Sequence, residues 1–501
     1  MILAASSAAT AWSLTLSDAV ASALHKNENL RVERESFAIA DADLLGAQGA
    51  YDPTLGANAS WRQASEPLNS SFTGAPEGEL ASTQESVSGD ASVTQRLKSG
   101  GSVVVRTSLV RTTSNDIYTL LTPAYDTAVG VEFRQPLLRG REVDESRLAL
   151  TVAGTERGRA GASLRREVIE TVAAVERAYW SLVAAREEVG VREESLALAE
   201  QQLADTKIRI DNGAAPVTEA AQPKAEIERR RGELLAAREN VSRLESALKV
   251  LILSDADADA WTRSVVPADH ADVRPMELDV AAAMEQALAS RPELEEAAAA
   301  AERRKAETAF AANTVKPALD AFVSYDRYGL AGTALNPSLN ERVQGGLGRS
   351  YSVLGDGDLD DARVGLSLTV SLGNRSAKAA SLAARSAERR AEAELASARN
   401  SVRGEVLDAV AAVRTALQRH EAARAERESA EVQLGAERDR FAVGYSTNFL
   451  VLTRQNDLAR ARLAEISSRT DYQIAGTELA RVTGFLLKQR GIEWQEALGV
   501  E

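Results

Sequence analysis

Few side chains in this sequence have the types and spacing that catalysis or metal binding requires. The three histidines, His25, His270 and His420, lie far apart and share no ligand spacing, so we expect them at the surface or at interfaces. Cysteine is absent, which excludes disulfides, thiol chemistry, Cys-ligated metals and a lipid anchor on an N-terminal Cys.

One acidic segment, "GDGDLDD" at 355–361, has the alternating aspartates with which a calcium loop begins. The glutamate that completes such a loop is missing, because Ser367 stands at its position. We therefore expect a solvated acidic loop. No phosphate loop, nucleophile–base pair or carboxylate constellation stands out among the 73 Asp and Glu residues. The sequence predicts a protein that is not an enzyme and carries no cofactor and no metal.

The composition favours long helices over a compact aromatic-rich domain. Hydrophobic residues make up 44% of the 501 residues but aromatic residues only 4%, and long tracts are dominated by Ala, Glu, Arg and Leu. The net charge is −14 and basic residues alternate with acidic ones, which argues against nucleic-acid binding.

The N-terminus reads as an export signal. The segment "MILAASSAATAWSLTL" is apolar and rich in small residues, and Ala9-Thr10-Ala11 before Trp12 has the form of a cleavage site. We interpret residues 1–15 as a signal-peptide remnant. The basic segment that normally precedes it is missing, which leaves the true translation start open. No run of 18 apolar residues occurs, so no transmembrane helix is expected.

Helix-breaking residues occur at two comparable places. Gly213 and Pro216 interrupt one long charged helical stretch, and Gly444 interrupts another in "RFAVGYSTNFLVLTRQND". Glycine suits the left-handed conformation at a helix end, and proline suits the first turn of the returning helix. The sequence thus predicts two helical hairpins with tips at 212–217 and 443–448.

The elements that position these tips are themselves duplicated. A constant offset of 264 residues aligns Leu24 with Leu288, Pro53 with Pro317 and Leu55 with Leu319, without a gap. Each half reads as helix, strands, very long helix, break and helix, and the Asp- and Pro-rich segment 255–279 between them reads as an irregular linker.

Apolar residues at intervals of seven predict coiled-coil packing along the long helices. In the first half the series is Val168, Val175, Leu182, Val189, Leu196, Leu203 and Ile210, and the return helix has Ile227, Leu234, Val241 and Leu248. In the second half Val406, Val413, Leu434 and Phe441 keep the register, although His420 and Arg427 interrupt it. A helix of about 70 residues is roughly 100 Å long, too long for a compact domain.

Alternating segments predict strands with one apolar and one polar face, within 51–138 and 318–372. A tight turn, Lys98-Ser99-Gly100-Gly101, joins two of them, whereas the connections 65–87, 113–126 and 329–361 are long and polar. Such asymmetry is typical of outer-membrane barrels. Four strands from the first half and two from the second cannot close a wide pore, so several chains must share one barrel.

The chain from 16 to 485 resembles the TolC-like family of outer-membrane efflux and secretion ducts. The resemblance is carried by the duplication, the two breaks, and the order of "GAYDPTL" (49–55), "FRQPLLRG" (133–140), "AYWSLVAA" (178–185) and "LTVSLGNR" (368–375). It implies a mixed α+β, mostly α protein that forms a homotrimer in the outer membrane of a Gram-negative bacterium. The shared β-barrel would contact lipid, and antiparallel helical hairpins would form an α-barrel in the periplasm.

By the same resemblance, the chain is a passive exit duct of a tripartite efflux or type I secretion system. Its partners would be a periplasmic adapter and an inner-membrane transporter of the RND, ABC or MFS type. The adapter-binding tips would comprise Arg209, Gly213, Ala214, Pro216, Val217, Arg440, Gly444, Tyr445, Ser446 and Thr447. A non-channel coiled-coil scaffold or tether is the alternative, because heptads fit both; the strands and the duplication favour the duct.

Two features depart from the family. The acidic ring that some members carry after the second tip is replaced here by Leu450 and Thr453. Glu219 and Gln222 occupy the same spacing after the first tip, so an acidic ring at the gate would come from Glu219 and Asp211. The first half also has four strands where two are usual, and the pair at 91–112 either enlarges the barrel, the favoured reading, or folds as a hairpin at its rim.

The predicted organisation is a first repeat over 16–254, the linker, a second repeat over 280–487 and a C-terminal tail at 488–501.

Overall fold

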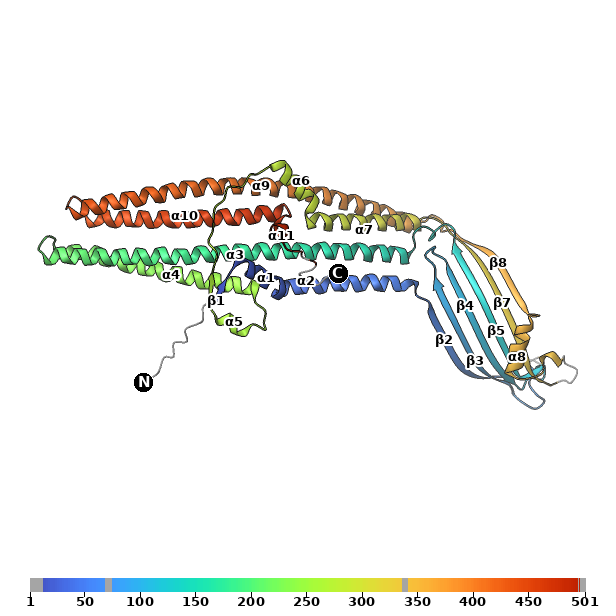
Figure 1. The fold of residues 1–501 in the computed structure, drawn as a ribbon. Coiled ribbons are helices and arrows are strands. Elements are labelled where there is room, and N and C mark those ends of the chain that lie inside the picture. The colour runs from blue at the N-terminus through green and yellow to red at the C-terminus, as the bar shows by residue number, and fades with distance from the viewer. Residues whose placement is uncertain (1–11, 68–73, 336–340, 494, 496–501) are drawn as a thin grey trace, which may run out of the picture. The chain divides into compact units, whose positions relative to one another are not determined.

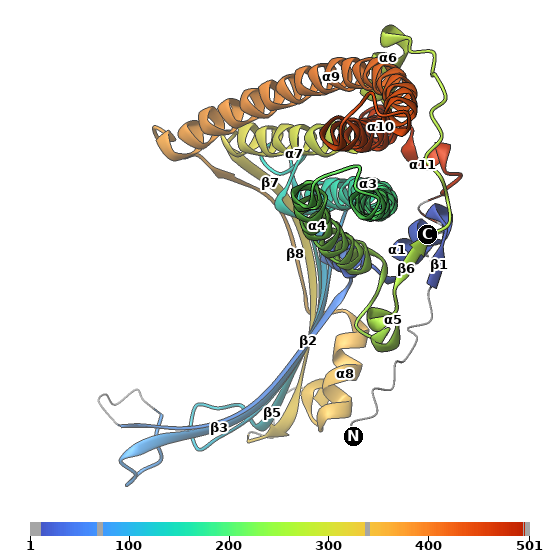
Figure 2. The same cartoon turned by 90° about the vertical axis from the view of Figure 1, so that its left-hand side faces the viewer.

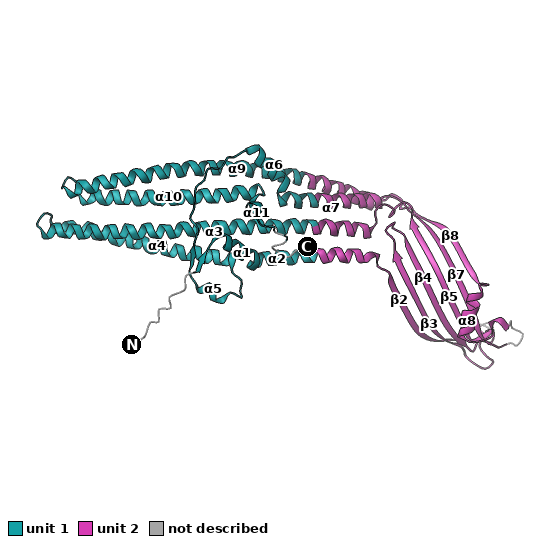
Figure 3. Cartoon of the chain, viewed as in Figure 1, with its two compact units in different colours: residues 1–39, 158–299, 393–501 teal, residues 40–157, 300–392 magenta. Residues whose placement is uncertain are grey.

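The computed structural model describes residues 12–67, 74–335, 341–493 and 495, and divides into two compact units (Figure 1, Figure 3). Unit 1 contains residues 1–39, 158–299 and 393–501, and unit 2 contains residues 40–157 and 300–392. The segment 1–11, which covers most of the predicted signal-peptide remnant, lies outside the described residues, as does nearly all of the tail after 493.

The duplication is visible in the order of the elements. The first half runs through α1 (Leu16–Lys26), α2 (Glu28–Gln48), η1 (Gly49–Tyr51), four strands, α3 (Glu145–Asp211), η2 (Val217–Ala220) and α4 (Ala221–Ile252). The second half runs through α6 (Val280–Ser290), α7 (Pro292–Thr314), two strands, α9 (Arg375–Ala442), α10 (Asn448–Val482) and α11 (Leu486–Gln489). The offset of 264 residues relates the start of α1 to the start of α6. It also relates the strand that begins at Thr54 to the strand that begins at Ala318.

The described residues of unit 1 form two large apolar clusters, centred on α3 and on α9, and a small third one between α9 and α10. Val168, Val175 and Leu182 of α3 are fully buried in the first, and Val406 and Val413 of α9 are buried in the second. Figure 2 views the helices of this unit nearly end on, with the α3–α4 hairpin beside the α9–α10 hairpin. None of the helices that the structure describes is both long and apolar enough to cross a membrane.

The linker 255–279 is more ordered than the sequence indicated. It contains the short helix α5 (Ala258–Thr262) and the strand β6 (Val265–Pro267), and β6 pairs in parallel with β1 (Trp12–Leu14). The hydroxyl of Tyr179 fixes both ends of this arrangement, since it lies 3.0 Å from the carbonyl oxygen of Leu14 and 2.8 Å from Oδ2 of Asp269. Acidic and proline-rich composition hid this pairing, because only three residues of each strand take part.

Unit 2 is built on one antiparallel sheet of six strands in the order β2-β3-β4-β5-β7-β8. The strands are β2 (Thr54–Pro67), β3 (Ala81–Arg96), β4 (Ser102–Ser114), β5 (Leu121–Pro136), β7 (Ala318–Ala334) and β8 (Asp360–Thr369). Four of them come from the first half and two from the second, and the predicted tight turn joins β3 to β4. Within the described residues, the edge strands β2 and β8 each pair on one side only.

The two faces of the sheet differ in chemistry. The cross-strand row Leu55, Val93, Val105, Val131 and Tyr325 crosses five strands on one face, and all five side chains are exposed. On the other face Arg106 reaches over Gly130 to Asp326, with a separation of 2.7 Å between its Nη2 and the carboxylate. Glycine at 130 permits this ion pair, because a Cβ there would lie 1.8 Å from Oδ1 of Asp326 and would displace its carboxylate.

A helix interrupts the predicted polar loop 329–361. Helix α8 (Leu347–Asp356), preceded by η3 (Glu341–Val343), packs on the loop end of β5 and β7, and Figure 2 shows it on the convex side of the curved sheet. Ser350 is fully buried and lies 2.8 Å from the hydroxyl of Thr127, on the apolar face. A Cβ at Gly329 would lie 2.1 Å from the carbonyl oxygen of Ser350, so glycine permits this contact. The helix was missed because ten residues give too short a window for helical periodicity.

Candidate functional site

The two hairpin tips in unit 1 end their long helices in the same way. At the first, Gly213 has φ +73°, its N–H donates to Ile210 and that of Ala214 donates to Arg209, at 2.9 and 2.8 Å. At the second, Gly444 has φ +83°, its N–H donates to Phe441 and that of Tyr445 donates to Arg440, at 3.1 and 2.8 Å. Both are Schellman motifs, in which glycine in the left-handed region satisfies the last helical carbonyls.

The returning helices begin differently. Pro216 has φ −75° and ψ 149° and is the N-cap of η2, so it precedes the first turn rather than belonging to it as the sequence predicted. Thr447 is the N-cap of α10, and its hydroxyl accepts a hydrogen bond from the N–H of Leu450. The second tip therefore re-enters an α-helix at once, whereas the first passes through a 3₁₀ turn.

Large side chains at the tips are left at the surface of the chain. Val217 is 77% exposed and Tyr445 is 87% exposed, and Val443 and Phe449 are also exposed. Exposed apolar and aromatic side chains on adjacent turns are typical of a contact surface for another protein.

A buried polar seam joins the two hairpins just behind the tips. The side chain of Asn448, at the start of α10, lies 2.5 Å from Nε2 of Gln202 and 3.1 Å from Oγ1 of Thr206 on α3. Its amide nitrogen lies 3.3 Å from Oε2 of Glu219. Gln202, Thr206 and Asn448 are all buried. Asn448 thus links the second tip to α3 and to the first tip by hydrogen bonds.

The seam continues along α4 through a buried charge. Arg230 is 1% exposed, and its guanidinium contacts Glu226, the carbonyl oxygen of Ser195, and the side-chain oxygens of Gln455 and Asn456. Burial opposes ionisation of Glu226, but hydrogen bonds from the neighbouring arginines outweigh it and lower the pKa of Glu226 to about 2. Because every partner is a hydrogen-bonding group, the buried charge is satisfied as long as the hairpins stay together.

Ion pairs extend the contact between α3 and α10 away from the tips. Glu194 pairs with Arg462 at 2.5 Å, Glu187 with Arg469, and Glu170 with Arg481 at 2.5 Å. Closer to the tips, the guanidinium of Arg209 lies 4.8 Å from the ring centre of Phe441, and a groove of about 710 Å³ opens between α3 and α9. Near the tips the hairpins are thus joined mainly by polar and ionic contacts, whereas farther away Ala480 of α10 and Leu486 and Leu487 of α11 share an apolar cluster with α3.

This seam departs from the predicted heptad line. Val189, Leu196, Leu203 and Ile210 are only half-buried, and the most buried positions in the tip half of α3 are Ser195, Ala199, Gln202 and Thr206. The reason is that α3 has two neighbours. The apolar series faces one of them, and a second, mostly polar stripe faces α10.

The predicted gate residues do not converge on one point. Glu219 is half-buried in the seam, whereas Asp211, at the last position of α3, and Gln222 are exposed. Leu450 is 39% exposed, and the hydroxyl of Thr453 donates to the carbonyl oxygen of Phe449 at 2.8 Å. The residues that sequence reasoning missed are Asn448, Gln202, Thr206 and Arg230, and only their polarity at helix positions near the breaks could have indicated them.

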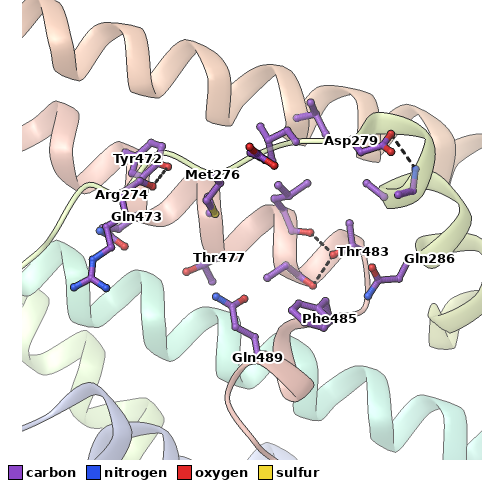
Figure 4. Close-up of a pocket in the computed structure, with 18 of the residues that line it drawn as sticks. Arg274, Met276, Asp279, Gln286, Tyr472, Gln473, Thr477, Thr483, Phe485 and Gln489 are labelled. Atoms are coloured by element: carbon purple, nitrogen blue, oxygen red, sulfur yellow. Dashed lines mark hydrogen bonds between the residues drawn. The ribbon is translucent and has the colours of Figure 1, made fainter.

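A second cavity, of about 730 Å³, lies under the irregular linker segment 272–279 (Figure 4). The hydroxyl of Tyr472 donates to the carbonyl oxygen of Arg274 at 2.6 Å and holds the linker over α10. Glu176 is the fully buried acid of this cavity, and it is already bound by Thr477 and Arg490, each at 2.6 Å. Within the described residues, no group of three His, Asp or Glu side chains is placed to hold a metal ion.

Comparison with known proteins gives a family match over part of the chain and a fold over nearly all of it. Residues 283–485 match the family model of outer membrane efflux proteins. No curated protein sequence matches the chain. The structure is similar to the CmeC outer membrane channel of Campylobacter jejuni, with TM-score 0.66 and 14% identity over 97% of this chain and 90% of that one.

It is also similar to the outer membrane protein VceC of Vibrio cholerae, with TM-score 0.65 and 16% identity over 94% of this chain and 96% of that one. A membrane protein of Pseudomonas aeruginosa is similar as well, with TM-score 0.65 and 20% identity over 94% of this chain and 93% of that one. At these identities the likeness concerns the fold. With the family match, it confirms the predicted mixed α+β, mostly helical fold and the resemblance to TolC-like ducts.

Proposed function

We propose that this chain, a member of the outer membrane efflux protein family by its residues 283–485, is the exit duct of a tripartite efflux or type I secretion system. Three copies would share one barrel in the outer membrane. The helical hairpins would extend into the periplasm, where a periplasmic adapter links them to an inner-membrane pump.

The observation that carries this proposal is the two-faced sheet with open edges. One face exposes apolar side chains across the strands, which suits lipid, and the other carries the ionic cluster of Arg106, Glu132 and Asp326, which suits a water-filled lumen. Unpaired backbone groups at the edges are not tolerated in lipid, so the sheet has to be completed by further copies. A coiled-coil scaffold would have no use for such a sheet.

The tips are the proposed adapter contact. Two Schellman turns of the same geometry would present alternating surfaces around a symmetric trimer, so that one kind of adapter meets both. The polar seam behind them is the proposed gate, because parting the hairpins exchanges its hydrogen bonds for water without exposing an apolar core. The inner-membrane pump would determine which cargo is exported. This subunit would supply only a passive conduit.

The test is fractionation followed by cross-linking. We expect the protein in the outer-membrane fraction, extracted only by detergent, and cross-linked to a periplasmic adapter through a photoreactive side chain at Tyr445. A photoreactive side chain at Arg424, an exposed position on α9 away from the tips, is the control. Recovery as a soluble protein without detergent would support the scaffold and refute the duct.

A second test addresses energy coupling. The purified protein, reconstituted alone, should show no ATP hydrolysis above background. Specific hydrolysis that co-purifies with the trimer would contradict a passive role.

A further inference from the structure

We infer that the outer-membrane wall is a single barrel of eighteen strands, in which the β3–β4 hairpin stands in the wall and the edge strands β2 and β8 pair with neighbouring copies of this chain. This rests on the trimer proposed above. It resolves the alternative in which the extra pair of strands folds at the rim of a twelve-stranded barrel.

The first argument is backbone pairing. β3 pairs with β2 from Thr54↔Thr94 to Pro67↔Ala81 and with β4 from Gln84↔Ser114 to Arg96↔Ser102, both without a register shift. β4 then pairs with β5 from Ser102↔Arg134 to Thr112↔Ala124. Moving the hairpin out of the sheet would leave β2 and β5 without these partners along their whole length.

The second argument is a side-chain tie across the strands. Arg106 on β4 spans β5 at Gly130 and binds the carboxylate of Asp326 on β7 in a bidentate manner. Glu132 on β5 lies 3.4 Å from the same guanidinium. This cluster links a strand of the inserted hairpin to the second repeat, so the hairpin is joined to the middle of the sheet and not to its rim.

The third argument is the continuity of both faces through the hairpin. Val87 and Val93 of β3 and Val105 of β4 continue the exposed apolar face between Leu55 and Val131. On the other face, Ser60 and Ser88 approach to 2.7 Å and Asn58 lies 2.9 Å from Asp90. A rim hairpin in water would have no reason to carry an apolar stripe in register with its neighbours.

The geometry of the two edge strands favours a second copy of this chain as the partner that pairs with them. The strands of the sheet alternate in direction, so β2 and β8 run antiparallel to one another, and β8 of one copy can pair with β2 of the next in the same antiparallel sense. Val364 and Leu366 on β8 and Leu55 on β2 are 82%, 69% and 75% exposed. These high exposures mark the places where the neighbouring strand would lie.

The consequence is a wide opening. With strands about 4.8 Å apart and tilted by about 40°, eighteen strands close at a radius of about 18 Å and twelve at about 12 Å. The cross-section enclosed by the backbone is then about twofold larger than in a twelve-stranded barrel.

The absence of cysteine makes a disulfide test clean. In the Ser60→Cys/Ser88→Cys variant the two sulfurs face each other on neighbouring strands, and we expect an intramolecular disulfide in the membrane-embedded protein. The rival pair is Ser60→Cys/Ala128→Cys, which joins β2 to β5 only if the hairpin has left the wall, and we expect no cross-link there. Both variants replace small side chains, so folding should be retained.

The edge contact is tested between copies. Arg363→Cys on β8 is combined in turn with Cys at Gly56, Asn58 or Ser60 on β2, and one combination should give covalent dimers and trimers. Cross-linking of Ser60→Cys/Ala128→Cys in a membrane-embedded trimer would overturn the eighteen-stranded wall and leave the duct intact. Failure of every edge pair in such a trimer would also overturn it. Loss of membrane insertion of the unmodified chain would instead refute the duct itself.

Discussion

Replacing Gly444 by valine tests whether the second tip acts through its shape. The residue has φ +83°, and none of the described atoms lies within 4 Å of the place where a Cβ would stand, so the substitution adds backbone strain and no collision. Holding a β-branched residue there costs on the order of 1–3 kcal/mol. The turn can relieve this strain only by giving up the hydrogen bonds to Arg440 and Phe441.

That cost is local to the tip. The helices on either side are anchored by buried residues such as Leu434 and Val451, so we expect the trimer to assemble and reach the outer membrane in normal amounts. Adapter cross-linking and export should fall, because a displaced turn recurs at every symmetry-related second tip.

Gly435→Val is the matched control. Gly435 lies in α9, the helix that ends just before Gly444. It is exposed, has no described atom within 4 Å of a Cβ position, and does not have positive φ. Valine there should leave abundance, cross-linking and export unchanged. The reasoning is refuted if Gly444→Val retains export and adapter cross-linking at the level of this control, since the tip would then be only a turn.

Three further predictions concern the seam and the sheet. Asn448→Ala removes the side chain that links the two tips and leaves its buried partners unsatisfied, which should destabilise the contact by about 1–3 kcal/mol and speed hydrogen exchange in the tip half of α3. Unchanged exchange would contradict the role of Asn448 in the polar seam. The pKa of Glu226 is lowered to about 2, so its contribution to stability is fully present above its ordinary pKa of 4.5 and is lost as the pH falls toward 2. The protection of α4 against hydrogen exchange, taken relative to the intrinsic exchange rate at each pH, should therefore be constant from neutral pH to about pH 5 and fall only below it. A loss of protection between pH 7 and 5 would count against this assignment. Gly329→Val should displace α8 and expose it to protease in the intact trimer, whereas Gly348→Val on the outward side of α8, with no described atom within 4 Å of its Cβ position, should not.

The sequence predicted the features that repeat. The offset of 264 residues and the two breaks follow from patterns that occur twice, and a pattern that recurs is less easily due to chance. The six strands were predicted from alternation of apolar and polar residues, although the β3–β4 pair has no counterpart in the second half. The tips were predicted because glycine between two long charged helical stretches favours a helix end, where the backbone adopts the left-handed conformation. Their common Schellman geometry supports that interpretation, although the predicted roles of the tip residues in adapter binding stay predictions.

The features that were missed depend on which elements become neighbours. Heptad spacing reports one apolar seam along a helix, but α3 packs against two helices, and the polar residues Gln202 and Thr206 face the second one. Helix α8 has ten residues and is held largely by Ser350 and by the absence of a side chain at Gly329. Neither contact is visible without knowing that β5 and β7 lie side by side, which the duplication alone does not reveal.

The most direct test of the duct is the native mass of the detergent-extracted outer-membrane protein. The account predicts an assembly of three copies that resists dissociation in detergent and is recovered from the outer-membrane fraction. A stable monomer, or a protein that remains in solution when detergent is withheld, would contradict it.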